Sequence, residues 1–500
     1  MEEIMKVTHA KNLSKINFNS TLSIPVDANV NIKNVLDVSS YIFDHKVECG
    51  NGKAIISGKI GVRVLYIDTD NMTNTLKESS SFSETYLDNA ITSDTNLNIA
   101  ESNIVNHVLS TEGTLKINCD VNISPVAYIN LALSNNIQTD DFMITKKSQV
   151  VSNSIDKFFN TKFDHSLTLE TKDTINKILC HNCHFTPELT IAENDYFVVE
   201  GKLVSCLLYE TSSNETNYVK EIKETSRVKC DVEVDGLNKD HSLDLSFYVD
   251  KSNEEITTEL EDGLSVVNIK NAIKVCGAIL KTITIDVVDD LYSTQNEIDT
   301  TLTKREYTKK AEHYSLGETI MNEMSLSSEE PAIDEVVANL NSNAEVTNSY
   351  IKDDTIYIEG VVTSNLTYID ENKELRNKQL ETPFIINTKV LTNSFGCVHS
   401  QVSILDYKIK VKRGTNLEVE YSLYVNLEIY EKETHEMVDN FKIGKKLDFS
   451  KYDFQIFIAK PNETVWDLSK RIKISPEELN KYNKDLPLVM EGGEKVIIKR

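Results

Sequence analysis

The sequence predicts a mainly β, multidomain protein, with three tandem antiparallel β-rich domains followed by a small α+β module of order β–α–α–β. Three observations predict this fold class. One segment occurs three times, the stretches around each copy alternate apolar and polar residues, and the C-terminal stretch changes to helix-start signals between two short strands. The apolar share, 40% of 500 residues, is enough for several separate cores.

The recurring segment is a strand-like apolar run in which a glycine precedes a tyrosine by eight residues. The glycines are Gly58, Gly201 and Gly360, and the tyrosines are Tyr66, Tyr209 and Tyr368. The copies lie a whole domain apart, too far for the unit of a solenoid. The tyrosines could contact a ligand, but we expect them to be strand residues that pack against a sheet.

The residues around each copy extend the repeat into a domain. Upstream of each glycine, apolar residues at spacing i, i+3, i+4 predict one short helical turn, at residues 32–36, 175–179 and 333–337. Downstream, strands of period two predict half-buried antiparallel pairs. We therefore expect three domains, at residues 18–134, 162–292 and 315–433. The polar segments between them, 135–161 and 293–311, are expected to be partly helical connectors.

The C-terminal module, residues 454–500, is predicted from local signals. A strand at 455–459 precedes a turn, and Thr464 is placed to N-cap a helix at 465–472. Ser475 and the proline after it start a second helix, and a last strand follows at 495–498. Trp466, the single tryptophan of the chain, lies at the edge of the first helix's apolar stripe, so it is either a core residue or an exposed anchor for a partner.

This module resembles a LysM domain. The family's Gly-Asp-Thr-Leu-Trp-x-Ile-Ala run corresponds to residues 462–469, its Leu-x-x-x-Asn to 479–483, and its Gly-x-x-Leu-x-Ile to 493–498. The sequence departs from the pattern at the Gly-Asp pair, which is Asn-Glu here. LysM domains bind N-acetylglucosamine polymers through the loops after the first strand and before the second. The resemblance therefore implies a partner- or glycan-binding site at Pro461, Asn462, Glu463, Thr464, Trp466, Lys484, Asp485, Leu486, Pro487 and Leu488.

The three repeats resemble SPOCS domains, which occur in spore-coat and spore-cortex proteins. Three SPOCS domains followed by one LysM domain is the arrangement of the SipL-like clostridial spore coat morphogenetic proteins. This resemblance implies a non-enzymatic adaptor in the mother-cell cytosol, at the forespore surface. There it would bind the coat-basement ATPase through the LysM domain, associate with other coat morphogenetic proteins, and support coat and cortex assembly. The alternative is a peptidoglycan-binding protein of the spore cortex or cell wall.

Charge and hydropathy restrict the partners. The formal net charge of −25 argues against nucleic acid, which needs clustered basic residues. From position 454 onward nine basic and seven acidic residues leave about +2, which either favours an acidic partner or is an ordinary mixed surface. No apolar run is long enough for a membrane span and no signal-peptide pattern is present, so we expect a cytosolic chain with reduced cysteines.

One cysteine motif stands out. Cys180, His181, Asn182, Cys183 and His184 form the Cys-x-x-Cys-His pattern of covalent haem attachment. Haem attachment is unexpected without export, and zinc would need two further ligands from elsewhere in the chain. We expect two reduced cysteines, no cofactor and no metal. No catalytic set is recognisable, and a hydrolase hidden in one repeat would require a deep pocket with converging titratable groups.

Overall fold

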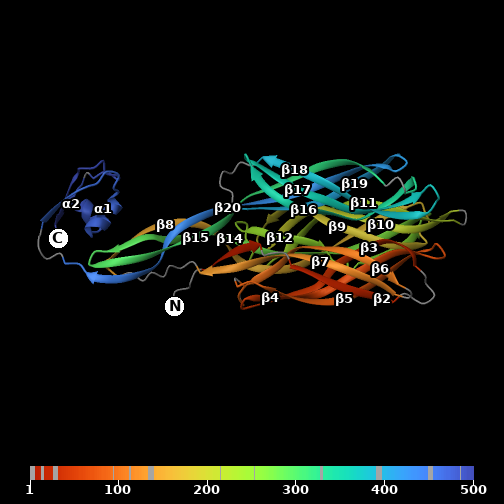
Figure 1. The fold of residues 1–500 in the computed structure, drawn as a ribbon, viewed down its shortest axis with the longest axis horizontal. Coiled ribbons are helices and arrows are strands. Elements are labelled where there is room, and N and C mark those ends of the chain that lie inside the picture. The colour runs from red at the N-terminus through yellow and green to blue at the C-terminus, as the bar shows by residue number, and fades with distance from the viewer. Residues whose placement is uncertain are drawn as a thin grey trace.

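The computed structural model describes residues 6–12, 16–25, 32–89, 91–93, 95–111, 114–132, 140–213, 216–252, 254–326, 330–389, 397–448, 454–484 and 486–499. About four fifths of these residues lie in antiparallel strands. Figure 1 shows a β-rich body, a narrower bundle of long strands that projects from it, and a small helical module at the far end of that bundle. The predicted β-rich multidomain class is therefore confirmed.

The first repeat is a two-sheet sandwich. Its strands are β1 (Lys6–Asn12), β2 (Ile16–Pro25), β3 (Ile32–Gly50), β4 (Lys53–Asp68), β5 (Thr73–Leu87), β6 (Asn96–Thr111) and β7 (Thr114–Ala132). The meander β3–β4–β5 forms one sheet. In the other, β7 pairs with β6 on one side and with β1 and β2 in succession on the other.

The second and third repeats follow the same strand order. The second contains β8 (Met143–Thr171), β9 (Lys177–Ala192), β10 (Tyr196–Ser213), β11 (Thr216–Glu233), β12 (Ser242–Val249), β13 (Glu255–Glu261) and β14 (Leu264–Ser293). The third contains β15 (Asn296–Ser325), β16 (Ile333–Lys352), β17 (Thr355–Asp370), β18 (Leu375–Lys389), β19 (Cys397–Arg413) and β20 (Asn416–Lys446). In each repeat the closing strand, β7, β14 or β20, pairs with the opening one, so the ends of a repeat meet in one sheet.

The core of each repeat lies between its two sheets. In the third repeat Ile358 and Val362 of β17 and Val419 and Leu423 of β20 are fully buried members of one cluster. They follow the period of two, because alternate strand residues point to the same face. Each such side chain contributes about 1.5–3 kcal/mol through burial.

The repeated glycine faces a β-bulge of the preceding strand in all three copies. The register shifts between Phe43 and Lys46 in β3, beside Gly201 in β10, and between Val346 and Asn348 in β16. A bulge brings one backbone and its side chains close to the opposite strand. A Cβ on Gly201 would lie 2.8 Å from the Phe185 ring, so only glycine fits there.

A second bulge lies beside the repeated tyrosine and corrects one prediction. Residues 32–36, 177–179 and 333–337 are strand residues of β3, β9 and β16, and residues 175–176 precede β9, so no helical turn forms. The extra bulge residue, Leu36 in β3 and Leu179 in β9, breaks the alternation and imitates helical spacing. The tyrosines are buried, with 5%, 2% and 2% exposure, which confirms that they are packing residues.

The connectors expected to be partly helical are also strands. Where they are described, residues 143–161 belong to β8 and residues 296–311 to β15. These segments continue beyond the sandwiches as two ribbons, β8 with β14 and β15 with β20, which form the stalk seen in Figure 1. Val150, Val287, Tyr307 and Met437 are buried between the ribbons. The helical prediction was wrong because these strands are largely polar and are stabilised by packing on another ribbon, which leaves little strand periodicity in the sequence.

The C-terminal module has the predicted order. Its elements are β21 (Phe454–Ile458), α1 (Val465–Ile472), α2 (Pro476–Tyr482) and β22 (Lys495–Lys499), with β21 and β22 antiparallel. Thr464 caps α1, since its hydroxyl accepts from the Asp467 amide in a reciprocal capping box. Leu468, Leu479 and Val496 form the fully buried centre of its core. No helix in the described part of the chain is long and apolar enough to cross a membrane.

Candidate functional site

The two loops predicted to bind a partner lie side by side in the module. Backbone hydrogen bonds join them: the Asn462 amide donates to the Met490 carbonyl at 2.9 Å, and the Met490 amide donates to the Glu463 carbonyl at 2.9 Å. Thr464 and Val489 form an isolated antiparallel bridge. The described residues of segments 461–464 and 484–488 therefore form one surface, the loop pair, although they are distant in sequence.

The loop pair offers both polar and apolar contacts. Leu488 is 85% exposed and its neighbour Val489 is 52% exposed. Leu486 instead packs partly against the module core, and Asp485 lies outside the described residues. The exposed members of the predicted set are Pro461, Asn462, Lys484, Pro487 and Leu488. An exposed leucine and an exposed lysine in one loop suit a protein surface that is partly apolar and partly acidic.

Glu463 holds the loop in shape from within. Its carboxylate accepts from Arg471 Nε at 2.6 Å, from Arg471 Nη2 at 2.9 Å and from the Lys460 amide at 2.9 Å. These hydrogen bonds, the one from Arg471 above all, lower the pKa of Glu463. The side chain is 8% exposed, so it positions the loop and is not presented to a ligand.

Trp466 is engaged by the stalk. Its indole Nε1 donates to Asp290 Oδ2 at 2.9 Å, and its ring meets Tyr292 edge-on with centroids 5.2 Å apart. Both partners lie near the end of β14. The sequence predicted either a core residue or an exposed anchor, and the structure places Trp466, half-buried, between the module and another part of the same chain. Its partners could not be found from local signals, since Asp290 and Tyr292 lie far away in sequence.

Further contacts fix the module on the stalk. Lys470 Nζ lies 2.6 Å from Asp290 Oδ1, and the Tyr292 hydroxyl donates to the Ile474 carbonyl at 2.6 Å. Lys473 Nζ lies 5.8 Å from the centre of the Tyr292 ring. Tyr292 is 1% exposed. One face of α1 is therefore docked, and the loop pair is the part of the predicted site that stays exposed.

A second polar centre lies where the three repeats meet. Leu36 and Leu65 of the first repeat, Leu179 and Leu208 of the second, and Leu340 of the third share one buried cluster. Polar side chains cross the same junction. Arg63 of β4 donates to the His181 carbonyl of β9 at 2.7 Å. The junction joins the repeats into one body by both apolar and polar contacts.

Asp37 connects the first and third repeats at this junction. Its carboxylate accepts from Asn341 at 2.6 Å and from Asn365 at 2.7 Å, and the residue is 5% exposed. Burial raises the pKa of Asp37, while the two amides and nearby Arg63 oppose the shift. Nothing in the sequence indicated this residue, because its partners come from another repeat.

Glu221 connects the second and third repeats. The Tyr407 hydroxyl lies 2.7 Å from both Glu221 carboxylate oxygens, and Lys223 stacks on the Tyr407 ring at 3.8 Å. Burial raises the pKa of Glu221 from 4.5 to about 6. Between about pH 4.5 and about pH 6 the folded protein therefore holds a proton here that the unfolded chain has released.

Replacing Glu221 with glutamine tests this shift. Between about pH 4.5 and about pH 6 the wild-type folded state binds more protons at this group than the unfolded state, so its contribution to stability falls as the pH rises. We compare the free energy of unfolding of Glu221→Gln with that of wild type. We expect this difference to shift in favour of the variant by about 2 kcal/mol when the pH is raised from about 4 to about 7. Denaturant unfolding at both pH values measures the difference. A constant difference between the two proteins would contradict the shift.

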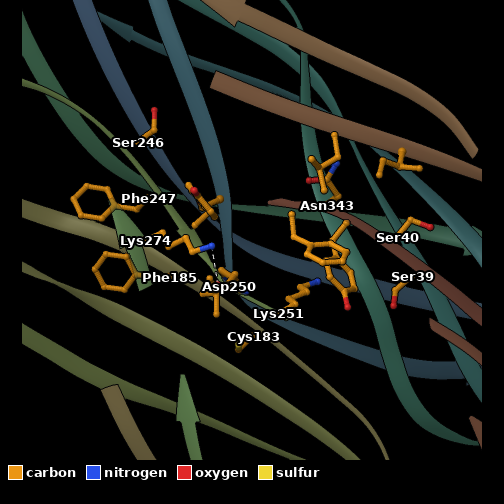
Figure 2. A pocket seen from close by; sticks show the side chains of 18 of the residues that line it. Ser39, Ser40, Cys183, Phe185, Ser246, Phe247, Asp250, Lys251, Lys274 and Asn343 are labelled. Atoms are coloured by element: carbon orange, nitrogen blue, oxygen red, sulfur yellow. Dashed lines mark ion pairs between the residues drawn. The ribbon is translucent and has the colours of Figure 1, made fainter. Parts of the chain in front are cut away.

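A cavity of about 830 Å³ lies between the repeats and opens beside this junction. Residues of all three repeats line it, among them Tyr41, Lys251 and Asn343. Figure 2 shows Lys251, Cys183 and the Asp250–Lys274 ion pair among the lining side chains; Asp250 Oδ2 and Lys274 Nζ are 2.8 Å apart. Cavities of this volume hold small molecules or ordered water. It lies between repeats, whereas the hydrolase alternative expected a pocket inside one.

The second repeat contains a hydrogen-bonded Ser–His–Glu arrangement, which resembles the catalytic triad of hydrolases. Glu254 contacts His181 Nδ1, and His181 Nε2 lies 2.7 Å from the Ser205 hydroxyl. A serine nucleophile must reach its substrate. Ser205 is fully buried and is not among the residues that line the cavity. The three side chains therefore bond to one another inside the sandwich, and the Ser205 hydroxyl is not presented to a substrate in the cavity.

The cysteine motif divides between two environments. Cys180 belongs to the buried cluster at the junction, whereas Cys183 belongs to the core of the second repeat and donates to Asn271 Oδ1 at 3.1 Å. Residues three apart in a strand point to opposite faces. The two thiols thus do not face each other, and every cysteine whose side chain is described is free.

The chain was compared with known families, curated proteins and solved structures. No protein-family model matches the chain, and no curated protein or solved structure matches it either.

Proposed function

We propose that this chain is a non-enzymatic spore-envelope morphogenetic adaptor. Its three SPOCS-like repeats form the body, and its LysM-like module binds the coat-basement ATPase at the forespore surface in the mother-cell cytosol, supporting coat and cortex assembly. The observation that carries the proposal is the placement of the module. It is held at the end of a stalk built from two repeats, with one face docked and the loop pair exposed.

This architecture suits an adaptor for mechanical reasons. The contacts of Asp290 and Tyr292 fix the orientation of the module relative to the body. A fixed module loses little orientational freedom when a partner binds, which favours affinity. The module is about +2 while the whole chain is −25, so the binding end would attract an acidic surface that the body repels.

The test is co-purification of full-length variants with the coat-basement ATPase. We expect Leu488→Asp to weaken binding at least about tenfold, because it places a charge at the centre of the loop pair's apolar contact. Ile456→Asp on the outer face of β21 is the matched control, since Ile456 is also exposed, at 58%. Full binding by Leu488→Asp together with loss in Ile456→Asp would move the site to the sheet face. Full binding by both variants would contradict a contact at either surface.

Peptidoglycan binding remains the second candidate, and one observation favours it. The loops that bind sugar in LysM domains are hydrogen-bonded to each other here and exposed. Sedimentation with purified cortex peptidoglycan separates the candidates. Saturable binding that Leu488→Asp abolishes, with no retention of the ATPase, would replace the adaptor proposal with a glycan-binding function.

A further inference from the structure

We propose that His181, Cys183 and Glu254 form a buried site for a divalent transition metal, with zinc as the ion that their chemistry fits best. The three residues each offer one ligand atom, and these atoms lie within 4.8 Å of one another. Donors at about 2.0–2.3 Å around a tetrahedral zinc ion are about 3–4 Å apart, so small side-chain rotations that part the hydrogen-bonded His181 and Glu254 would admit the ion. The donor set of one nitrogen, one sulfur and one oxygen excludes magnesium and calcium, which take oxygen ligands.

The backbone places the ligands without help from the Cys-x-x-Cys spacing. His181 and Cys183 are two apart on β9 and therefore point to the same face of the strand. Glu254 reaches them from the segment between β12 and β13. Cys180 takes no part, because it lies in the junction cluster on the opposite face. Sequence spacing alone would have selected the wrong cysteine pair.

The surrounding groups orient the ligands as at protein metal sites. His181 Nε2 lies 2.7 Å from the Ser205 hydroxyl, which leaves Nδ1 on the side of Glu254. Cys183 is hydrogen-bonded to Asn271. Metal-binding histidines are regularly held through their second ring nitrogen, and such partners change affinity 10–100-fold. The His181 side chain is fully buried and that of Glu254 is 13% exposed, so both are fixed before an ion arrives.

Access and charge are both compatible with an ion. Cys183 lines the cavity between the repeats, so an ion and a water molecule as fourth ligand can reach the sulfur from that side. When the metal–sulfur bond forms, the Cys183 thiol loses its proton to solvent. The thiolate and the Glu254 carboxylate then balance the two positive charges of the ion. The loaded site is therefore neutral beside Arg63 and Lys251.

The experiment measures zinc in the full-length protein. Chelator-treated protein is dialysed against zinc and its metal content determined, and cobalt is used in parallel to detect a thiolate-to-cobalt charge-transfer band. We expect one equivalent of zinc and a single-thiolate cobalt spectrum. Cys183→Ser and Glu254→Gln should each weaken zinc binding at least about tenfold, and Ser205→Ala by about 10–100-fold.

Cys180→Ser is the matched control, since it removes the other thiol of the same motif. It should retain full zinc content and the same cobalt band. The proposal is overturned if wild-type protein takes up no stoichiometric zinc, or if Cys180→Ser loses the metal as Cys183→Ser does. Circular dichroism shows that Cys180→Ser is folded before its zinc content is compared, and the cobalt band of wild-type protein is a readout that needs no variant.

Discussion

Replacing Gly360 with alanine will destabilise the third repeat by about 3 kcal/mol. The added Cβ would lie 2.8 Å from Cε1 of the Phe384 ring and closer still to the Glu345 carbonyl oxygen. Neither neighbour can move freely, because Phe384 belongs to the repeat core and Glu345 is part of the β16 backbone at the bulge. Denaturant unfolding followed by circular dichroism, with hydrogen exchange to locate the loss in β16–β18, measures the effect.

Gly317→Ala is the control in the same repeat. Gly317 lies in β15, and the nearest atom to its added Cβ would be 4.0 Å away. Alanine there should change the free energy of unfolding by less than about 1 kcal/mol, with stabilisation expected because glycine is costly in strands. Equal losses at Gly317 and Gly360 would show that the close approach at the bulge does not explain the repeated glycine.

Replacing Tyr292 with alanine will release the C-terminal module from the stalk. The change removes the buried ring against Trp466 and the hydrogen bond to the Ile474 carbonyl. Loss of a buried aromatic side chain costs about 3–5 kcal/mol, which is large for so small an interface. Trp466 is the only tryptophan, so its emission reports this contact alone and should shift to longer wavelength. Circular dichroism should show the body unchanged.

Two neighbouring aspartates give a test variant and a control variant for this prediction. Asp290 contacts Trp466 and Lys470, whereas Asp289 contacts Ser148 and His435 within the stalk. Asp290→Asn should shift the tryptophan emission in the same direction as Tyr292→Ala, and Asp289→Asn should leave it unchanged. An unchanged spectrum in both Asp290→Asn and Tyr292→Ala would contradict docking of the module in solution.

The parts of the fold that follow from local signals were predictable. The capping residues Thr464 and Ser475 start α1 and α2 as expected, because a cap satisfies backbone donors within its own turn. The two loops of the loop pair were implied by the resemblance to LysM domains, and the structure places them side by side. Trp466 shows the limit: its helix was predicted, but its contact with Asp290 depends on where β14 ends in space.

The wrong predictions have a common physical cause. At Leu36 and Leu179 a bulge inserts one residue into a strand, and the resulting spacing resembles a helical turn. In the segments that form the stalk, residues such as Val150 are buried only because another ribbon packs on them. Periodicity reports which residues alternate, but it does not report the partner that makes a strand more stable than a helix.

The sequence by itself determined that this chain contains three copies of one β-rich domain and a C-terminal β–α–α–β module, because alternation, caps and turns are local properties. Only the tertiary structure decided how these parts are joined. It placed Arg63 and Asp37 in a junction between repeats, docked Trp466 on the stalk, and gathered His181, Cys183 and Glu254. Each of these contacts joins residues far apart in sequence, and their free energy appears only when the sandwiches pack together.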